Sequence, residues 1–545
     1  MLLKPDECDS FGEKLKGFQL RIEDTCAGAD FSYPPQRGQS YLMPARYSGI
    51  LAAACLLICL PVLPATGAEP VSDRQIIHVL NRLAFGPTLE DFNHLRSIGV
   101  DRYIAEQLDP ESIPEPFALQ WRIAALDTLR YDAAQLRQLY GPLTGIRGFT
   151  LPPELEKMQR ERARTIVQQA AEGRILRAVL SRRQLQEVMV DFWFNHFNVF
   201  AGKDLDHLWI GDYEQRAIRP FALGRFRDLL FAVTKHPAML VYLDNTLSTA
   251  PGSPGARGNR SGLNENFARE VMELHTLGAA GGYTQEDVIT LARILTGWSI
   301  NRPDAREFPD HAAVFEGARH DFGPKVFLGH ALRSKGKAEG EEALDILAKS
   351  PATARHIAFE LAQYFVADEP PTPLVERLAA RFLATDGNIR EVLSALFVSR
   401  EFWESYSQKY KTPYNFVISA VRAAGVPVDN IRPLLDTMTR LGMPLFGCLT
   451  PDGYKNTEGA WLSPDTTARR INFATALARG SLTIGAALGA SSDPPRPHAA
   501  SPVNAASLEE IFGSTMSTAT RETVAEAPPG LRAALILGSP DFMRR

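Results

Sequence analysis

Residues 184–199 read QLQEVMVDFWFNHFNV, and this stretch decides the fold of the chain. A helix turns by roughly 100° per residue, and at that spacing the polar residues of the stretch share one stripe. The stripe consists of Gln184, Glu187, Asp191, Asn195 and Asn198. The opposite side is apolar apart from His196. The pattern predicts an α-helix that faces a core, in which His196 is either a hydrogen-bonded core residue or part of a site.

The helical spacing continues outward in both directions. From residue 73 onward apolar residues recur mostly three and four positions apart, and alternating runs are few. This favours a mainly α-helical fold with one large multi-helix domain over residues 69–545. Ser72-x-x-Gln75 and Thr284-x-x-Asp287 are typical of helix starts, so we expect helices from about residues 73 and 285.

Three segments interrupt the helical pattern. Residues 247–262 and 485–507 are rich in Gly, Pro and Ser, a composition typical of mobile loops. Between residues 298 and 330 the helical spacing lapses, and residues 313–316 and 325–328 bracket a turn. We therefore expect a small β-hairpin-like excursion near residues 313–328.

Composition narrows the class of protein. The chain has 545 residues, of which 45% are apolar and 22% charged, so neither a disordered polymer nor a polytopic membrane protein fits. Lys and Arg total 59 against 63 Asp and Glu, and the net charge of −4 offers no basic surface for nucleic acid. The five cysteines form no C-x-x-C pair and no Cys/His zinc spacing, which argues against a thiol-held metal.

An apolar run near the N-terminus resembles a signal peptide. Residues 50–63, ILAAACLLICLPVL, are too few to span a bilayer as a helix but suit the apolar part of a secretory signal. Arg46 precedes the run, and Thr66 and Ala68 occupy the −3 and −1 positions of a cleavage site. We expect cleavage after Ala68.

Met43 provides a start for this signal, because secretory signals begin close to the first residue. In this interpretation residues 43–68 are the signal peptide and residues 1–42 are a mis-assigned or disordered extension; the alternative is a long genuine leader. Either way we expect an exported protein of the periplasm or cell surface. No transmembrane helix is expected after signal cleavage.

Residues 264–278, NENFAREVMELHTLG, form the first candidate site. We expect a helix that ends at Gly278, with Asn266, Glu270 and Glu273 close together on one flank. Two carboxylates and an amide could bind a divalent metal ion, or act as an acid and a base if their pKa values separate. The alternative is a solvated face with ion pairs to nearby arginines.

The second candidate site lies in the excursion, where the sequence reads HDFGPK. His320 and Asp321, with Lys325 four positions on, could serve as metal ligands or as a base and the group that orients it. A polar turn without chemistry is the equal alternative.

Four stretches together resemble the bacterial domain of unknown function 1800 family. They are HVLNRLAFGP at 78–87, FWFNHFNV at 192–199, residues 264–278 with GGYTQ at 281–285 and LTGW at 295–298, and HDFGPK at 320–325. The resemblance covers roughly residues 73–545. It implies an exported protein, often encoded beside a second exported family similar to sulfatases and alkaline phosphatases, and it implies no activity. The family's characteristic positions map onto Asn195, His196, Asn266, Arg269, Glu270, Glu273, His275, Thr284, Gln285, Trp298, His320, Asp321 and Lys325.

Two functions follow, and the sequence leaves open whether the protein is an enzyme. The first is a helical binding or scaffold protein that acts with a neighbouring exported sulfatase-like protein or an envelope polymer; it is favoured because no G-x-S-x-G or H-E-x-x-H motif is present. The second is a metal-assisted hydrolase of an envelope glycan or ester. Its candidate catalytic residues are Glu270, Glu273, His320 and Asp321, its candidate binding residues are Asn195, His196, Asn266, Arg269 and Lys325, and its candidate ligands for a divalent metal ion are Glu270 and Glu273.

Overall fold

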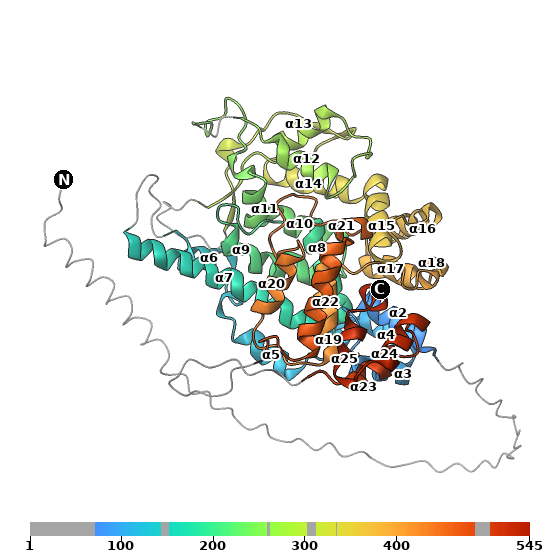
Figure 1. The fold of residues 1–545 in the computed structure, drawn as a ribbon. Helices are drawn as coiled ribbons and strands as arrows, with labels where there is room; N and C mark the ends of the chain where they lie inside the picture. Colours follow the sequence, from blue (N-terminus) through green and yellow to red (C-terminus); the bar gives the residue numbers. More distant parts are fainter. Residues whose placement is uncertain (1–70, 143–151, 259–261, 302–311, 334, 486–501) are drawn as a thin grey trace, which may run out of the picture. The chain divides into compact units, whose positions relative to one another are not determined.

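The computed structural model describes most of the predicted domain (Figure 1). The described residues are 71–142, 152–258, 262–301, 312–333, 335–485 and 502–545. They belong to one compact unit, Ala68–Arg545. The predicted extension 1–42 and signal peptide 43–68 lie outside the described residues. Among the helices that the structure does describe, none has the length and apolar content needed to cross a membrane.

The fold is mainly helical, as the sequence predicts. The N-terminal half contains α2 (Asp73–Leu83), α3 (Leu89–Ile98), α4 (Val100–Leu108), α5 (Phe117–Ala124), α6 (Ala133–Tyr140), α7 (Pro153–Leu180), α8 (Gln184–His196), α9 (Asp206–Asp212), the π-helical turn η3 (Tyr213–Ile218), α10 (Phe226–Lys235), α11 (Pro237–Tyr242), the short turn η5 (Asn245–Leu247) and α12 (Glu265–Glu273). The C-terminal half contains α13 (Gln285–Ile294), α14 (Lys337–Ala348), α15 (Pro351–Phe365), α16 (Thr372–Ala384), α17 (Ile389–Phe397), α18 (Arg400–Glu404), α19 (Pro413–Ala424), α20 (Arg432–Arg440), α21 (Glu458–Trp461), α22 (Pro464–Ala478), α23 (Ala505–Phe512), α24 (Thr518–Glu526), α25 (Pro529–Leu537) and α26 (Pro540–Met543).

Capping explains where two of these helices begin. The Ser72 side chain accepts a hydrogen bond from the Gln75 backbone N–H, and the Gln75 side chain accepts one from the Ser72 backbone N–H, which completes a capping box at the start of α2. Thr284 and Asp287 form the same box at the start of α13. Both helix starts predicted from sequence are confirmed.

The non-helical excursion is also confirmed, and it forms two small antiparallel sheets. Strand β1 (Trp298–Ile300) pairs with β2 (Ala313–Phe315), and β3 (Val326–Phe327) pairs with β4 (His330–Ala331). The two segments predicted to bracket a turn therefore form strands β2 and β3. These strands do not pair with each other, because β2 pairs with β1 and β3 pairs with β4. A short 3-10 turn at Gly317–Arg319 separates the two sheets.

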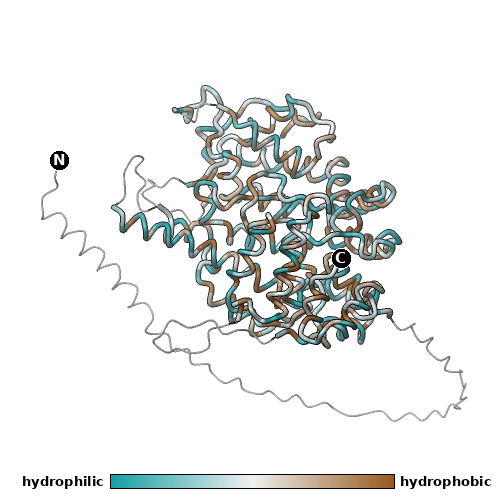
Figure 2. The backbone as a smooth tube through the Cα atoms, in the orientation of Figure 1, coloured by the Kyte–Doolittle hydropathy of each residue, from teal (hydrophilic) through white to brown (hydrophobic). Residues whose placement is uncertain are grey.

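Burial follows the hydropathy of the chain (Figure 2). Helix α8 is buried around nearly its whole circumference, and so is α19. The first half of α7 is hydrophilic and largely exposed. A helix that is buried on all sides must satisfy its polar groups internally, and α8 carries a full stripe of them.

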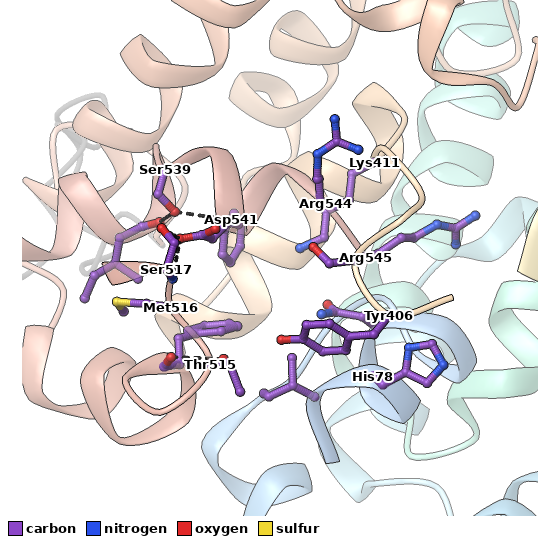
Figure 3. Close-up of a pocket in the computed structure, with 16 residues that line it drawn as sticks. His78, Tyr406, Lys411, Thr515, Met516, Ser517, Ser539, Asp541, Arg544 and Arg545 are labelled. Atoms are coloured by element: carbon purple, nitrogen blue, oxygen red, sulfur yellow. Dashed lines mark hydrogen bonds between the residues drawn. The ribbon is translucent and has the colours of Figure 1, made fainter. Parts of the chain in front are cut away.

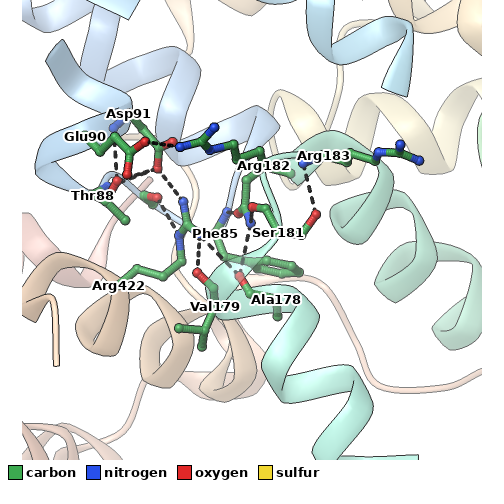
Figure 4. A network of polar contacts seen from close by, with 12 residues as sticks. Phe85, Thr88, Glu90, Asp91, Ala178, Val179, Ser181, Arg182, Arg183 and Arg422 are labelled. Carbon is green, nitrogen blue, oxygen red and sulfur yellow. Dashed lines mark hydrogen bonds and ion pairs between the residues drawn. The ribbon is translucent and has the colours of Figure 1, made fainter. Parts of the chain in front are cut away.

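The first member of that stripe joins α8 to the N-terminal helices. Gln184 donates to the carbonyls of Ala178 (3.2 Å) and Ser181 (2.8 Å) and accepts from the Phe85 amide (3.1 Å). Close to this contact, Arg422 of α19 bonds Asp91 of α3 (2.6 Å) and carbonyls at the end of α7 (Figure 4). These hydrogen bonds join α3, α7 and α19, which are distant from one another in sequence.

The middle of the stripe lies in a buried network of charges. Arg174 of α7 donates to Asp191 (2.5 Å) and pairs with Glu214 of η3 (3.3 Å). Arg219 pairs with Glu187 and with Glu214 (3.1 Å). All five side chains are buried or nearly so, and each charge has a partner of opposite sign. The network fixes α7, α8 and η3 relative to one another.

The end of the chain packs beside α2 and α15. The backbones of Lys409 and Arg545 exchange hydrogen bonds, and the Arg545 guanidinium donates to the Tyr364 carbonyl (3.0 Å). A cavity of about 190 Å³ remains between α2 and the last helices (Figure 3). Two of its polar groups are paired, since Lys411 donates to Ser419 (2.8 Å) and Asp541 accepts from the Ser517 hydroxyl (2.8 Å). Nδ1 of His78 and Oδ1 of Asn81, which also line it, have no hydrogen-bond partner among the described residues.

Arg174→Met tests the buried network. The substitution leaves Asp191 buried without its ion-pair partner and leaves Glu214 with Arg219 alone, so we expect a loss of about 3–5 kcal/mol in the free energy of unfolding, measured by urea denaturation. Arg160→Met on the same helix is the control, because Arg160 is exposed and pairs with Glu156 one turn away; its cost should stay within about 0.5 kcal/mol. Equal costs for the two variants would contradict the structural role of the network.

Candidate functional site

A cavity of about 230 Å³ lies beside α8, where that helix meets α15 and the 452–456 segment. Its wall is rich in ionisable and amide groups. These groups include the side chains of Asn195, His196, His356, Glu360, Asp452 and Lys455. Two of them, Asn195 and His196, are among the binding residues predicted from sequence.

His196, the last residue of α8, lies between two hydrogen-bond acceptors. Its Nδ1 is 2.9 Å from Oε2 of Glu360, and its Nε2 is 3.2 Å from the carbonyl oxygen of His275. A neutral imidazole has one N–H and can donate to only one acceptor. Both contacts can be hydrogen bonds only if the pair of His196 and Glu360 carries an additional proton, and a metal ion bound at Nδ1 would be the alternative.

His356 brings a third ligand-type group to the same place. It precedes Glu360 by one turn of α15, so the two side chains share a helix face. His356 Nε2 is 3.8 Å from Oε1 of Glu360 and 3.1 Å from the Leu274 carbonyl oxygen. One ligand atom from each of His196, His356 and Glu360 lies within 4.8 Å of the others. Within the described ranges no other three His, Cys, Asp or Glu side chains have this spacing.

The electrostatics of the cluster favour the metal-binding forms of these groups. Burial and the nearby His196 lower the pKa of His356. Burial acts to raise the pKa of Glu360, but the hydrogen bond from His196 and the charges of His356 and Lys455 bring it below the ordinary glutamate value. A neutral imidazole and a carboxylate are the forms that coordinate cations.

The end of α12 supplies the carbonyls that orient both histidines. The helix ends at Glu273, earlier than the predicted end at Gly278. The physical reason is Thr276, whose hydroxyl donates to the Val271 carbonyl (2.7 Å), while the Leu277 amide bonds the Met272 carbonyl (2.7 Å). In this wide turn the Leu274 carbonyl points at His356, and the His275 carbonyl points at His196.

His275 forms the floor behind the cluster. Its ring is fully buried, 6.1 Å from that of His196 and 5.0 Å from that of Phe197 between centroids. Burial and the two neighbouring histidines hold its pKa well below the ordinary value, so it is neutral. Its Nε2 has no hydrogen-bond partner among the described residues.

Asn195 fixes the far wall of the cavity. Its amide donates to the Tyr454 carbonyl (2.8 Å), and its carbonyl accepts from the Tyr454 amide (2.7 Å). Gly453 lies so close to Asn195 that an added Cβ on Gly453 would be 2.2 Å from the backbone carbonyl oxygen of Asn195. Asn198 donates to the Cys448 and Thr450 carbonyls (3.1 and 2.9 Å). The last part of the α8 stripe thus holds the segment that carries Asp452 and Lys455.

Glu270 and Glu273 do not line the cavity and do not join the cluster of His196, His356 and Glu360. Burial, Glu273 and Asp452 raise the pKa of Glu270, and no described hydrogen bond reaches its carboxylate. Glu273 accepts from the Tyr283 hydroxyl (3.0 Å). The carboxylate neighbour that sequence analysis did not foresee is Asp452, which lines the cavity.

The other predicted binding residues of α12 face outward. Asn266 is exposed. Arg269 donates to Gln285 (2.8 Å), which in turn donates to Glu265 (2.7 Å). Arg269 therefore makes its contacts with Gln285 and Glu265, and not with Glu270 or Glu273.

The His320 turn forms a network of its own. His320 Nδ1 is 2.8 Å from the Thr296 carbonyl oxygen, and its Nε2 is 3.3 Å from Glu339. Asp321 accepts from Arg293 (2.7 Å), and Lys325 donates to Glu339 (2.8 Å). None of the three predicted residues lines the cavity, and their described contacts join β-strand connections to α13 and α14.

Comparison with known families identifies the chain's relatives. The model described as "Protein of unknown function (DUF1800)" matches residues 78–544. The chain belongs to this family. No curated protein and no solved structure matches it. The match spans every element of the site, from α8 to the 452–456 segment.

Within this family member, sequence reasoning missed His356 and Glu360. The missed signal is His-x-x-x-Glu in residues 356–360, a spacing that places two ligand-type side chains on one helix face. It lies outside the four stretches that carry the family resemblance. The link to His196 was not readable, because it joins residues 164 positions apart.

Asn195→Ala tests the role of Asn195 as an anchor. We expect faster hydrogen exchange in residues 450–456 and a loss of about 1–3 kcal/mol in the free energy of unfolding, because two backbone groups lose their partner. Asn266→Ala, at an exposed site on α12, should change neither. Unchanged exchange in the 450–456 segment would contradict the anchoring role.

Proposed function

We propose that the cavity binds a divalent transition-metal ion through His196, His356 and Glu360 and uses it to hydrolyse a polar ester or glycosidic substrate. The observation that carries the proposal is the cluster itself, with three ligand atoms within 4.8 Å of one another at the wall of a polar cavity. This is the hydrolase alternative drawn from the sequence, with a different set of ligands.

The donor set suits a catalytic metal. Two histidines and one glutamate are a set that catalytic zinc sites use, and three protein ligands leave a further position for water. The carbonyl of His275 accepts from Nε2 of His196, which orients the ring so that Nδ1 faces the cluster. A bound metal would lower the pKa of its water and polarise a substrate carbonyl.

Groups on and beside the wall could move protons and bind substrate. Glu270 does not line the cavity, but burial and the charges of Glu273 and Asp452 raise its pKa, and a carboxyl with a raised pKa is better suited to act as a general acid than an ordinary glutamate. Lys455 pairs with Asp452 (2.6 Å) but remains largely exposed, so its ammonium is accessible to an anionic or hydroxyl-rich substrate.

A binding or scaffold function is the second proposal, and one observation favours it. Without a metal, a second proton between His196 and Glu360 satisfies both groups, and Asn195, Asp452 and Lys455 also have partners. A polar network that is satisfied in this way stabilises a fold and presents a polar surface without turnover. The partner would be a neighbouring exported sulfatase-like protein or an envelope polymer.

Both proposals place the mature protein outside the cytoplasm, in the periplasm or at the cell surface. The support is the apolar run at residues 50–63 followed by Thr66 and Ala68.

Elemental analysis of the full chain, purified without chelator, separates the two functions. We expect stoichiometric zinc or a related metal in the wild type and none in a His356→Gln/Glu360→Gln variant that still folds. A Glu270→Gln/Glu273→Gln variant is the matched control and should keep its metal. The wild type should release p-nitrophenol from ester or glycoside probes, and the His356→Gln/Glu360→Gln variant should not. Failure of the wild type to bind added zinc would overturn the metal site and favour the binding function.

Glu270→Gln tests whether that carboxylate is kept for function. A raised pKa means that the folded state disfavours the charged form, so the wild type loses stability as pH rises through the pKa of Glu270. We expect the variant to be more stable than the wild type at pH 8 by a few tenths of a kcal/mol to about 1 kcal/mol, and not at pH 4. Hydrolysis should nevertheless fall. A variant that is less stable at pH 8 and keeps full activity would assign Glu270 a structural role.

A further inference from the structure

The cavity between α2 and the last helices is separate from the proposed metal site (Figure 3). Its volume is about 190 Å³, and Thr515 and Ser517 of its wall are partly or fully exposed. The buried side chains of Ile77, Met516 and Ile536 give the wall an apolar part. The cavity therefore has room for a small molecule with a few carbon atoms.

The Lys411 ammonium lines this cavity and contacts only neutral groups. The residue is 2% exposed. Its Nζ donates to the Ser419 hydroxyl (2.8 Å) and lies 4.0 Å from the centroid of the Phe542 ring. An ammonium has three N–H donors, and these contacts use one of them for a hydrogen bond. Lys411 thus keeps donors for a further partner.

Two buried arginines add positive charge beside Lys411. Arg470 is 0% and Arg545 2% exposed, and their charges, together with burial, hold the pKa of Lys411 well below its ordinary value. Arg545 donates to the Tyr364 carbonyl (3.0 Å) and the Asn415 side-chain oxygen (3.4 Å), and Arg470 donates to the Lys411 carbonyl (2.8 Å). Neither Nε has a partner among the described residues. Buried charges of one sign are costly unless an opposite charge joins them.

The acidic residues near this group have other partners. Asp541 lines the cavity and accepts from the backbone N–H (3.0 Å) and the hydroxyl (2.8 Å) of Ser517. Glu458 pairs with Arg544 (2.6 Å). The charges that act on Lys411 are those of the two arginines. An anion that pairs with Lys411 would therefore have to enter the cavity.

Two acceptors in the same cavity lack a donor. Nε2 of His78 is 2.9 Å from the Phe402 carbonyl oxygen, so it carries the proton and Nδ1 is an acceptor. Burial and the nearby Arg82 lower the pKa of His78 to about 3, which keeps the ring neutral. His78 is 2% exposed, and neither its Nδ1 nor Oδ1 of Asn81 has a described partner. Buried acceptors normally bind a donor, so a hydroxyl group or water is expected here.

We propose that this cavity binds a short-chain hydroxy acid. Its carboxylate pairs with the Lys411 ammonium, and its hydroxyl donates to His78 Nδ1 or Asn81 Oδ1. Its carbon atoms pack against the apolar part of the wall. Water satisfies the two acceptors equally well, but it supplies no negative charge for Lys411.

Thermal unfolding of the full chain with added probes tests the proposal. We expect 3-hydroxybutyrate at about 10 mM to raise the Tm, because a ligand of the folded state stabilises it. Butyrate should raise the Tm less, since it lacks the hydroxyl. Butanediol and sodium chloride at equal ionic strength should have no effect. No rise with 3-hydroxybutyrate, or a larger rise with inorganic phosphate, would overturn the proposal.

Lys411→Met tests the cationic partner. It keeps most of the side-chain volume and removes the charge, so we expect 3-hydroxybutyrate to bind at least about tenfold more weakly, measured by calorimetry. Without ligand the variant should be at least as stable as the wild type, because a buried charge is lost. Equal affinity in the folded variant and the wild type would contradict the assignment.

Two further measurements keep this site distinct from the proposed metal site. A carboxylate is also a metal ligand, so His356→Gln/Glu360→Gln must keep the response to 3-hydroxybutyrate; its loss there would move the binding to the other cavity. If Lys411→Met does not fold, reductive methylation of the wild type replaces it. The probe should protect Lys411 but not Lys455, which is largely exposed, as read by mass spectrometry of peptides. Equal labelling of Lys411 with and without the probe would overturn the proposal.

Discussion

The polar stripe of α8 is the constraint on which the rest of the structure depends. A helix buried on nearly all sides must find a partner for every polar side chain, and each partner of this stripe comes from a different part of the chain. Gln184 binds the connection from the N-terminal helices, Asp191 and Glu187 bind buried arginines, and Asn195 and Asn198 bind the backbone of the 448–454 segment. The energetic need to satisfy one helix therefore determines where four other segments lie.

The site follows from this arrangement. Because α8 is fixed along its whole length, its last residue, His196, is presented at a defined place beside α15. Because α12 ends early, the carbonyls of residues 274 and 275 are free to accept hydrogen bonds from His356 and His196. Helix α15 adds His356 and Glu360 on one face. No single element carries all three ligand-type groups. The chemistry arises where a helix end, an unwound turn and a helix face meet.

Local features of the sequence predicted much of the fold. Capping boxes gave the starts of α2 and α13, the helical spacing gave the fold class, and its lapse gave the β excursion. The end of α12 was wrong, because the hydroxyl of Thr276 competes with the glycine stop at Gly278. Asn195 and His196 were recognised as site residues. Their partners were not, since the contacts of His196 with Glu360 and of Asn195 with Tyr454 join residues 164 and 259 positions apart. Periodicity reports which face is buried, but it does not report what lies against it.

The hydrogen bonds between Asn195 and Tyr454 also have a consequence for biosynthesis. The first wall of the cavity is made early in translation and the opposite wall comes from the last quarter of the chain, so an incomplete polypeptide has half a cavity. A prematurely terminated product would retain His196 and even α15, but not the segment that closes over them. The cavity can therefore close only after residue 456 has been translated.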